Sequence, residues 1–135
     1  MRYMSGIYAL NHEVNCGKAD WHMHSRDWSK ATFKETSDSI LNSKGVLDFK
    51  GEYVANVARA FADLLEEHKF RWLKGFRTEF LLDDETKQEL FSYARKLNDT
   101  EVDLFMGSEY GTEYFTELSK PFTEYFESKG LRYVG

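Results

Sequence analysis

The sequence predicts an α+β fold in which a small N-terminal β element packs on a bundle of three to five helices. Two observations carry this prediction. Short β-forming runs bounded by turn residues occupy the N-terminal part of the chain. In the second half, apolar residues recur at spacings of three, four and seven, as in helices that bury one face. A length of 135 residues fits one domain, 1–135, with enough chain to bury a core.

The N-terminal β element is predicted to be a hairpin. Met4–Leu10 is its first strand, Asn15–Lys18 its turn and Asp20–Arg26 its second strand. The polar segment Ser29–Lys50 is then a loop, with a short turn or strand at Val46–Phe49. This part of the chain therefore supplies the sheet.

Helices are predicted for most of the second half. Glu52–His68 has the spacing of a helix with one buried stripe, and Phe70–Leu81 continues as a second helix. Asp83 or Asp84 caps a third helix. The inner face of this third helix carries Leu90, Phe91, Ala94 and Leu97.

Two further segments complete the predicted helical part. Asn98 or Asp99 starts a short helix that runs through Phe105. Ser108–Lys129 then repeats aromatic and apolar residues at steps of four. A break is expected just before Pro121, because proline lacks a backbone donor.

Charge is distributed unevenly along the chain. The net charge is −5, but residues 1–78 carry 12 basic and 10 acidic residues, whereas residues 79–135 carry 6 and 13. An acidic chain binds nucleic acid poorly, because phosphates repel it. The charge therefore makes direct nucleic-acid binding an unfavoured function, and the acidic half is suited to a partner with a basic surface.

The single cysteine, Cys16, cannot form an internal disulfide, which favours a reducing, cytoplasmic location. The N-terminal segment is too polar for a signal peptide or a membrane span, and no membrane association is expected. No sequence motif indicates a cofactor. Homo-oligomers are compatible with the composition.

One cluster could bind a metal ion. In a strand, Asp20, His22 and His24 project from one face, and His12 or Cys16 could complete a site for zinc or iron. Cys16 beside a histidine could also act as a nucleophile. Histidines on a polar strand face and an ordinary thiol explain the same pattern, so the metal-dependent enzyme remains an alternative.

A second cluster interleaves cations with aromatic rings. Arg71, Lys74 and Arg77 recur at steps of three on one helical side, and Trp72 lies among them. Cations and rings together could contact phosphates and stack on bases. A solvated face over a buried aromatic stripe is the competing interpretation, so nucleic-acid binding is also kept as an alternative.

A third cluster lies in the acidic half. Glu109, Glu113 and Glu117 recur at steps of four, parallel to Tyr110 and Tyr114. Repeated acids disfavour an isolated helix, so a basic partner or a solubilising role would explain them. We therefore predict a partner-binding surface of these acids with the two tyrosines as anchors. A second predicted surface contains Trp21, His22 and Trp28.

Two short elements carry a resemblance to a known group. Gly6–Asn11 and Asp20–His22 resemble segments of small uncharacterised bacterial proteins from toxin–antitoxin or phage-conflict loci. The resemblance covers about the first fifth of the chain and implies an interaction protein without catalytic residues. Together with the acidic, aromatic surface, it predicts a small protein-binding regulator or inhibitor, antitoxin-like in character.

Overall fold

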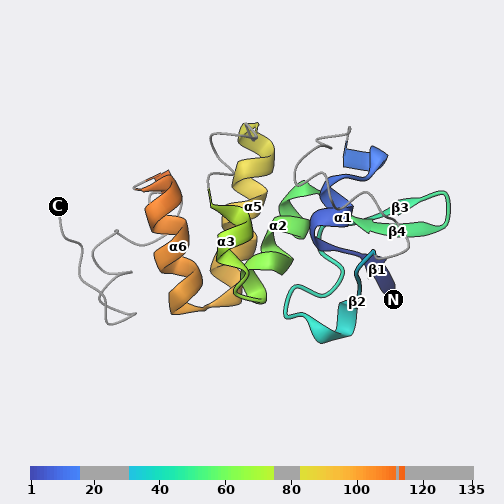
Figure 1. Cartoon of the computed structure of the whole chain (residues 1–135), viewed down its shortest axis with the longest axis horizontal. Helices are drawn as coiled ribbons and strands as arrows, with labels where there is room; N and C mark the ends of the chain where they lie inside the picture. The colour runs from blue at the N-terminus through green and yellow to red at the C-terminus, as the bar shows by residue number, and fades with distance from the viewer. Residues whose placement is uncertain (16–30, 75–82, 112, 115–135) are drawn as a thin grey trace.

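The computed structural model of the chain describes residues 1–15, 31–74, 83–111 and 113–114. Within these ranges a four-stranded mixed sheet lies at one end and five helices make up the rest (Figure 1). The α+β prediction is confirmed. Two short 3-10 turns, Glu13–Asn15 and Thr36–Asp38, accompany these elements.

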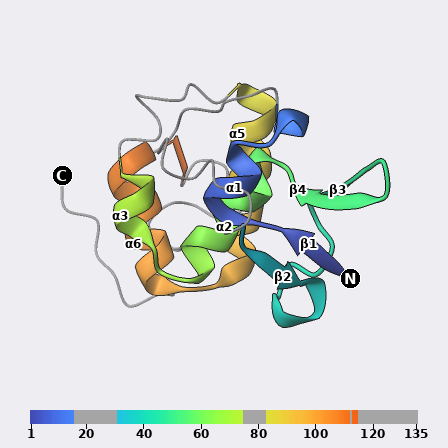
Figure 2. The same cartoon turned by 45° about the vertical axis from the view of Figure 1, so that its right-hand side comes forward.

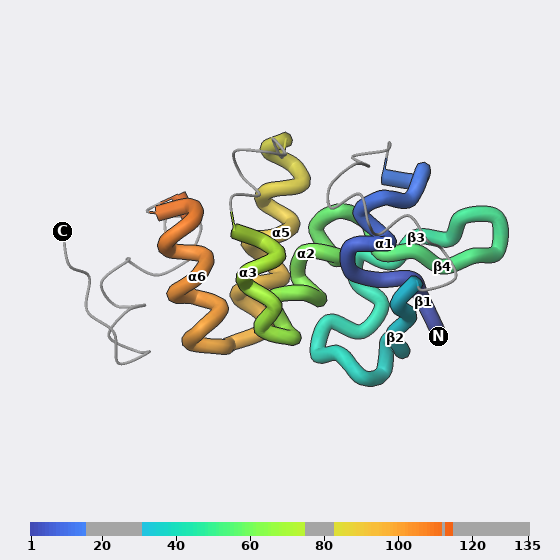
Figure 3. The backbone as a smooth tube through the Cα atoms, viewed as in Figure 1, coloured from blue at the N-terminus to red at the C-terminus, as the bar shows by residue number. Residues whose placement is uncertain are grey.

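The sheet has the strand order β2-β1-β4-β3. β1 (Arg2–Met4) pairs antiparallel with β2 (Phe33–Glu35) and parallel with β4 (Glu52–Ala55). β4 also pairs antiparallel with β3 (Val46–Phe49), which confirms the short strand predicted there. The two residues that join β3 to β4 both have positive φ, as in the tight turn typical of hairpins, and Gly51 adopts such a φ readily. This hairpin projects from the rest of the molecule (Figure 3).

The first predicted strand is wrong over most of its length. β1 ends at Met4, and Gly6–Leu10 forms the helix α1. Gly6 has a φ of +66°, which turns the chain out of the strand at no steric cost. Asp20–Arg26, the second strand of the predicted hairpin, lies outside the described residues. β1 instead has β2 and β4 as neighbours, and β2 was missed within the predicted loop.

The predicted helix over residues 52–68 is wrong at its start. Its first four residues are strand β4, and the helix α2 covers Val57–Glu66. Asn56 separates the two, because its side chain accepts a hydrogen bond from the N–H of Arg59 and so caps the helix. Val54 is fully buried between β1 and β3, where a β-branched residue packs well.

α2 lies in the middle of the molecule, between the sheet side and the remaining helices (Figure 2). α3 (Phe70–Leu73) follows it, and the rest of the predicted helix from 75 to 81 lies outside the described residues. α5 (Asp84–Leu97) packs along α2 and is capped by Asp83, as predicted. Three of the four residues predicted for its inner face are buried and the fourth is partly buried: Leu90, Phe91, Ala94 and Leu97.

The last described helix, α6 (Thr100–Tyr110), runs beyond the predicted end at Phe105. Asp99 caps it by accepting hydrogen bonds from the N–H groups of Glu101 and Val102. Since α5 and α6 are joined by only two residues, they run in opposite directions side by side (Figure 1). The first turn of α5 therefore lies at the same end of the pair as the last turn of α6.

A buried polar network holds the sheet to α2. The Asp63 carboxylate accepts hydrogen bonds from Arg59 Nε at 2.8 Å, from the Tyr3 hydroxyl at 2.7 Å and from Ser5 Oγ at 2.5 Å. Arg59 also donates to the backbone carbonyls of Asn42 and Lys44. Because Asp63 and Arg59 are no more than 1% exposed, each charge is compensated inside the protein. Burial, followed by the nearby Asp63 carboxylate, raises the pKa of the Tyr3 hydroxyl.

Candidate functional site

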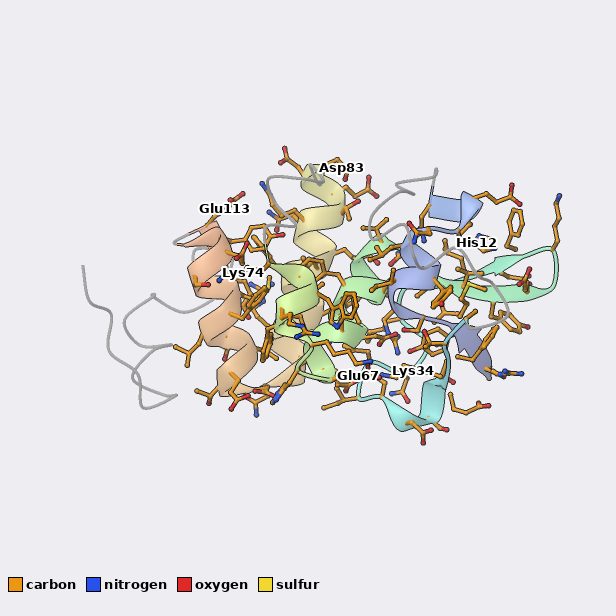
Figure 4. The ribbon with its side chains drawn as sticks, in the orientation of Figure 1. His12, Lys34, Glu67, Lys74, Asp83 and Glu113 are labelled. Atoms are coloured by element: carbon orange, nitrogen blue, oxygen red, sulfur yellow. The ribbon has the colours of Figure 1, made fainter. Side chains whose placement is uncertain are left out.

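Four acidic residues of the second half lie at one end of the α5–α6 pair. Asp84 and Glu85 are exposed in the first turn of α5, while Glu109 and Glu113 are half-buried at the end of α6 and beyond it. Figure 4 shows Asp83 and Glu113 at this same end, each at the tip of its helix. We call Asp84, Glu85, Glu109 and Glu113 the acidic end.

A lysine connects the two helices within the acidic end. Lys87 forms an ion pair with Glu113 and a second with Asp84 at 3.5 Å. The hydrogen bond to Glu113 is the main reason why the pKa of Lys87 is raised. The Glu113 side chain is 33% exposed and that of Asp84 is 97% exposed. Lys87 therefore neutralises part of this charge and leaves Asp84 open to solvent.

The two tyrosines of the predicted surface lie in the protein interior. Tyr110 is 3% exposed and Tyr114 is fully buried, and each ring makes an edge-on contact with Phe91. The Tyr114 hydroxyl donates to the buried Asp103 carboxylate at 2.8 Å. The expectation that these rings are exposed anchors is therefore wrong. Both rings contact Phe91 of α5, Tyr110 from the last residue of α6 and Tyr114 from beyond its end.

Several predicted site residues lie outside the described parts of the chain. Among the residues that the structure does describe, no group of three or more His, Cys, Asp or Glu side chains could hold a metal ion. His12, one of the further ligands considered, is buried and packs edge-on against Phe49. The predicted residues outside the described ranges are Cys16, Asp20, Trp21, His22, His24, Trp28, Arg77 and Glu117.

The structure describes three residues of the predicted nucleic-acid face. Arg71 and Lys74 are exposed at α3 and at its C-terminal end, as a solvated cationic face requires. Trp72 is half-buried, and the Arg71 guanidinium lies 5.9 Å from the centre of its ring. This geometry fits stacking on a base and equally fits packing within the protein.

A cavity that the sequence did not indicate lies where the sheet meets α1, α2 and α3. Its volume is about 380 Å³. Among the described residues, the walls come from three stretches of chain that are far apart in sequence, and no local motif connects them. The residues that line the cavity are Ser5, Gly6, Ile7, Tyr8, Thr32, Phe33, Lys34, Leu64, Glu67, Lys69 and Trp72.

Three charged side chains line this cavity. Lys34 Nζ lies 3.5 Å from Glu67 and 3.9 Å from Glu66, and Lys69 Nζ lies 3.2 Å from Glu67. Figure 4 shows Lys34 and Glu67 next to each other, on β2 and after α2. The described part of the lining therefore includes two ammonium groups and one carboxylate.

Comparison of the chain with protein-family models, with characterised proteins and with solved structures finds no match. In the parts of the chain that the structure describes, no helix has the length and apolar character needed to cross a membrane. Two features thus define the candidate sites, the acidic end of the α5–α6 pair and the cavity beside the sheet.

Proposed function

We propose that the protein is a small cytoplasmic protein-binding regulator or inhibitor, antitoxin-like in its action, that contacts a partner through its acidic end. The supporting observation is the gathering of four carboxylates at one end of two antiparallel helices, with Lys87 as the cation that pairs with two of them. The partner surface would carry Lys and Arg side chains.

Electrostatics gives this arrangement a binding role. Like charges held close together repel each other, and a basic surface relieves that repulsion while it speeds encounter between the partners. The acidic end is rigid at its base, since α5 packs on α2 and the Tyr110 and Tyr114 rings pack on Phe91. A rigid surface loses less conformational entropy when it binds.

The resemblance of two N-terminal segments to proteins of toxin–antitoxin or phage-conflict loci agrees with an interaction role. Gly6–Asn11 includes α1, which lies on the other side of α2 from α6, Asp20–His22 lies outside the described residues, and the acidic end contains no residue of either segment. The proposed partner surface therefore does not depend on them, and the acidic end can be tested by itself.

The test compares two double charge reversals that change the net charge equally. Glu85→Lys with Glu109→Lys alters the acidic end, and Asp38→Lys with Glu52→Lys alters exposed acids on the sheet side. Each pair adds four units of charge, which takes the formal net charge from −5 to −1. Circular dichroism checks that both variants keep the helical signal of the wild type.

Each protein is used as bait in an extract of its native host, and the captured proteins are quantified by mass spectrometry at low and high salt. We expect a basic protein that the wild type and the sheet-side variant capture, and that the acidic-end variant loses. Capture of the same proteins by both variants would contradict the proposal. So would capture that salt does not weaken, because exposed charge contacts are screened by salt.

A further inference from the structure

The cavity beside the sheet brings cationic and aromatic groups together from separate elements. Lys34 comes from β2, Lys69 follows α2, Trp72 comes from α3 and Tyr8 from α1. Its volume of about 380 Å³ falls in the range of roughly 300–1,000 Å³ that holds small molecules. We propose that this cavity binds a small organic anion with a single carboxylate and a planar apolar body.

The ammonium group of Lys34 supplies the main reason for an anion. Its side chain is only 18% exposed, so its charge is largely shielded from water. The carboxylates of Glu66 and Glu67 stand 3.9 Å and 3.5 Å from it. Charge-assisted N–H···O bonds are shorter, about 2.7–2.9 Å. Lys34 thus retains donor capacity for an acceptor placed in the cavity.

The charges around the cavity indicate how many anionic groups the ligand would carry. Among the described lining residues, Lys34, Lys69 and Glu67 carry charge and together sum to one positive charge. Glu66 is not part of the lining, and its carboxylate accepts a long hydrogen bond from the backbone N–H of Ile40. Because Glu66 also pairs with Lys34, the four groups together are neutral, so a ligand with one carboxylate is favoured over a highly charged phosphate ester.

The remaining walls favour an apolar, flat body. Rings of Tyr8, Phe33 and Trp72 line the cavity with aliphatic side chains. Gly6, whose φ of +66° favours glycine, adds no side chain to the wall. Flat aromatic ligands stack on such rings, which aliphatic chains cannot do.

The hydroxyl groups of the lining already have acceptors for their protons. Ser5 Oγ donates to Asp63, and the Thr32 hydroxyl donates to the backbone carbonyl of Ser5 at 2.9 Å. Among the non-aromatic lining side chains, the lysines therefore remain as the donors. The lining therefore favours a ligand with a carboxylate over a sugar-like ligand, which would need many uncharged hydrogen-bonding groups.

The proposal is tested with indole-3-acetate as the probe and its neutral amide, indole-3-acetamide, as the matched control compound. Each is titrated into the ¹⁵N-labelled protein while amide and indole signals are recorded by NMR. We expect saturable shifts at Gly6, Ile7, Lys34 and the Trp72 indole N–H, which the Trp72→Phe variant identifies. Indole-3-acetamide cannot form the charge-assisted bond, so it should bind about tenfold more weakly than indole-3-acetate.

Two variants of equal charge sharpen the result. Lys34→Gln should weaken indole-3-acetate about tenfold and leave indole-3-acetamide unchanged. Lys96→Gln, on the exposed surface of α5, should change neither. Equal binding of the two compounds to the wild type would overturn the proposal, as would shifts at other residues or none in the millimolar range. These outcomes do not depend on the acidic end, so the two proposals can fail separately.

Discussion

The two sides of α2 bury polar groups in different ways. On the sheet side, Asp63 shares its charge with Arg59, and the pair contacts β1 and the carbonyls of a loop. On the side of the later helices, Asp103 is equally buried and accepts a hydrogen bond from the neutral phenol of Tyr114. One side thus contains a buried ion pair, and on the other a buried carboxylate accepts a hydrogen bond from a phenol.

This difference follows from how far apart the connected segments lie in sequence. The Arg59 network joins residues near 3, 43 and 61, so one arginine holds three parts of the chain in place. The link between Asp103 and Tyr114 spans only 11 residues. We therefore expect the sheet side to lose its structure cooperatively when the network is broken, and the aromatic side to respond more locally.

The largest effect is expected from Arg59→Met. This change leaves the Asp63 charge buried without its cation, and breaking a buried pair in this way costs about 3–5 kcal/mol. Urea unfolding followed by circular dichroism measures the free energy of unfolding. Asp63→Leu added to Arg59→Met removes the remaining charge, and this double variant should recover much of the loss. A loss below about 1 kcal/mol in the single variant would show that the network does not hold the sheet side.

A smaller effect is expected on the aromatic side from Tyr114→Phe. The ring contact with Phe91 remains, but the Asp103 carboxylate loses one hydrogen-bond donor, which costs about 1–3 kcal/mol. A double-mutant cycle with Asp103→Asn isolates the bond itself. If both single changes were neutral and additive, the contrast between the two sides of α2 would have to be abandoned.

The elements that sequence predicted well are those with local signals. Asp83 and Asp99 both cap helices as expected, because a short acidic side chain before an amphipathic run bonds to the exposed N–H groups of the first turn. The buried face of α5 followed from its apolar spacing alone. The strand at 46–49 was also recognised within a polar stretch.

The elements that sequence missed depend on tertiary pairing. β4 has helical spacing, yet it forms a strand because β1 and β3 hydrogen bond to it on both sides. Three-residue β2 carries no pattern of its own, and Gly6 signals the end of β1 only once its positive φ is known. The cavity was missed for the same reason, since Lys34 and Trp72 meet only after folding.

Of the predicted acidic row, the structure describes Glu109 and Glu113, and the tyrosines beside them are buried. Glu109 and Glu113 lie at one end of α6, as the spacing of four indicates. The adjacent Tyr110 and Tyr114 follow the same spacing, and sequence alone does not tell which of two parallel rows faces the core. The aromatic row is buried here because burying apolar surface stabilises the fold more than burying charged surface does.

The smallest expected effect concerns an exposed contact of His68, which follows α2, with residues at the start of α6. Its Nε2 lies 2.6 Å from Asp99 and its Nδ1 lies 2.9 Å from Glu101, and its ring stacks on Phe70. The hydrogen bond with Asp99 raises the pKa of His68 above its ordinary value, against a smaller opposing effect of burial. Burial raises the pKa of Asp99, but the hydrogen bonds from His68 and from the helix N–H groups lower it by more. The pKa of Asp99 is therefore below its ordinary value.

The signs of these shifts define a pH window. The raised pKa of His68 means that its contribution to stability is complete below about pH 6.5 and is lost as pH rises through the folded value. The lowered pKa of Asp99 gives a contribution that is complete above about pH 4 and is lost in acid. Urea unfolding of wild type and His68→Gln from acid to mildly alkaline pH measures the difference in stability. We expect that difference to be largest between those limits, to shrink below the lower limit and as the pH rises through the raised pKa of His68, and to be smaller in high salt because the groups are exposed. A difference independent of pH would show that His68 acts through its ring contact with Phe70, so that packing and not charge connects the end of α2 to α6 here.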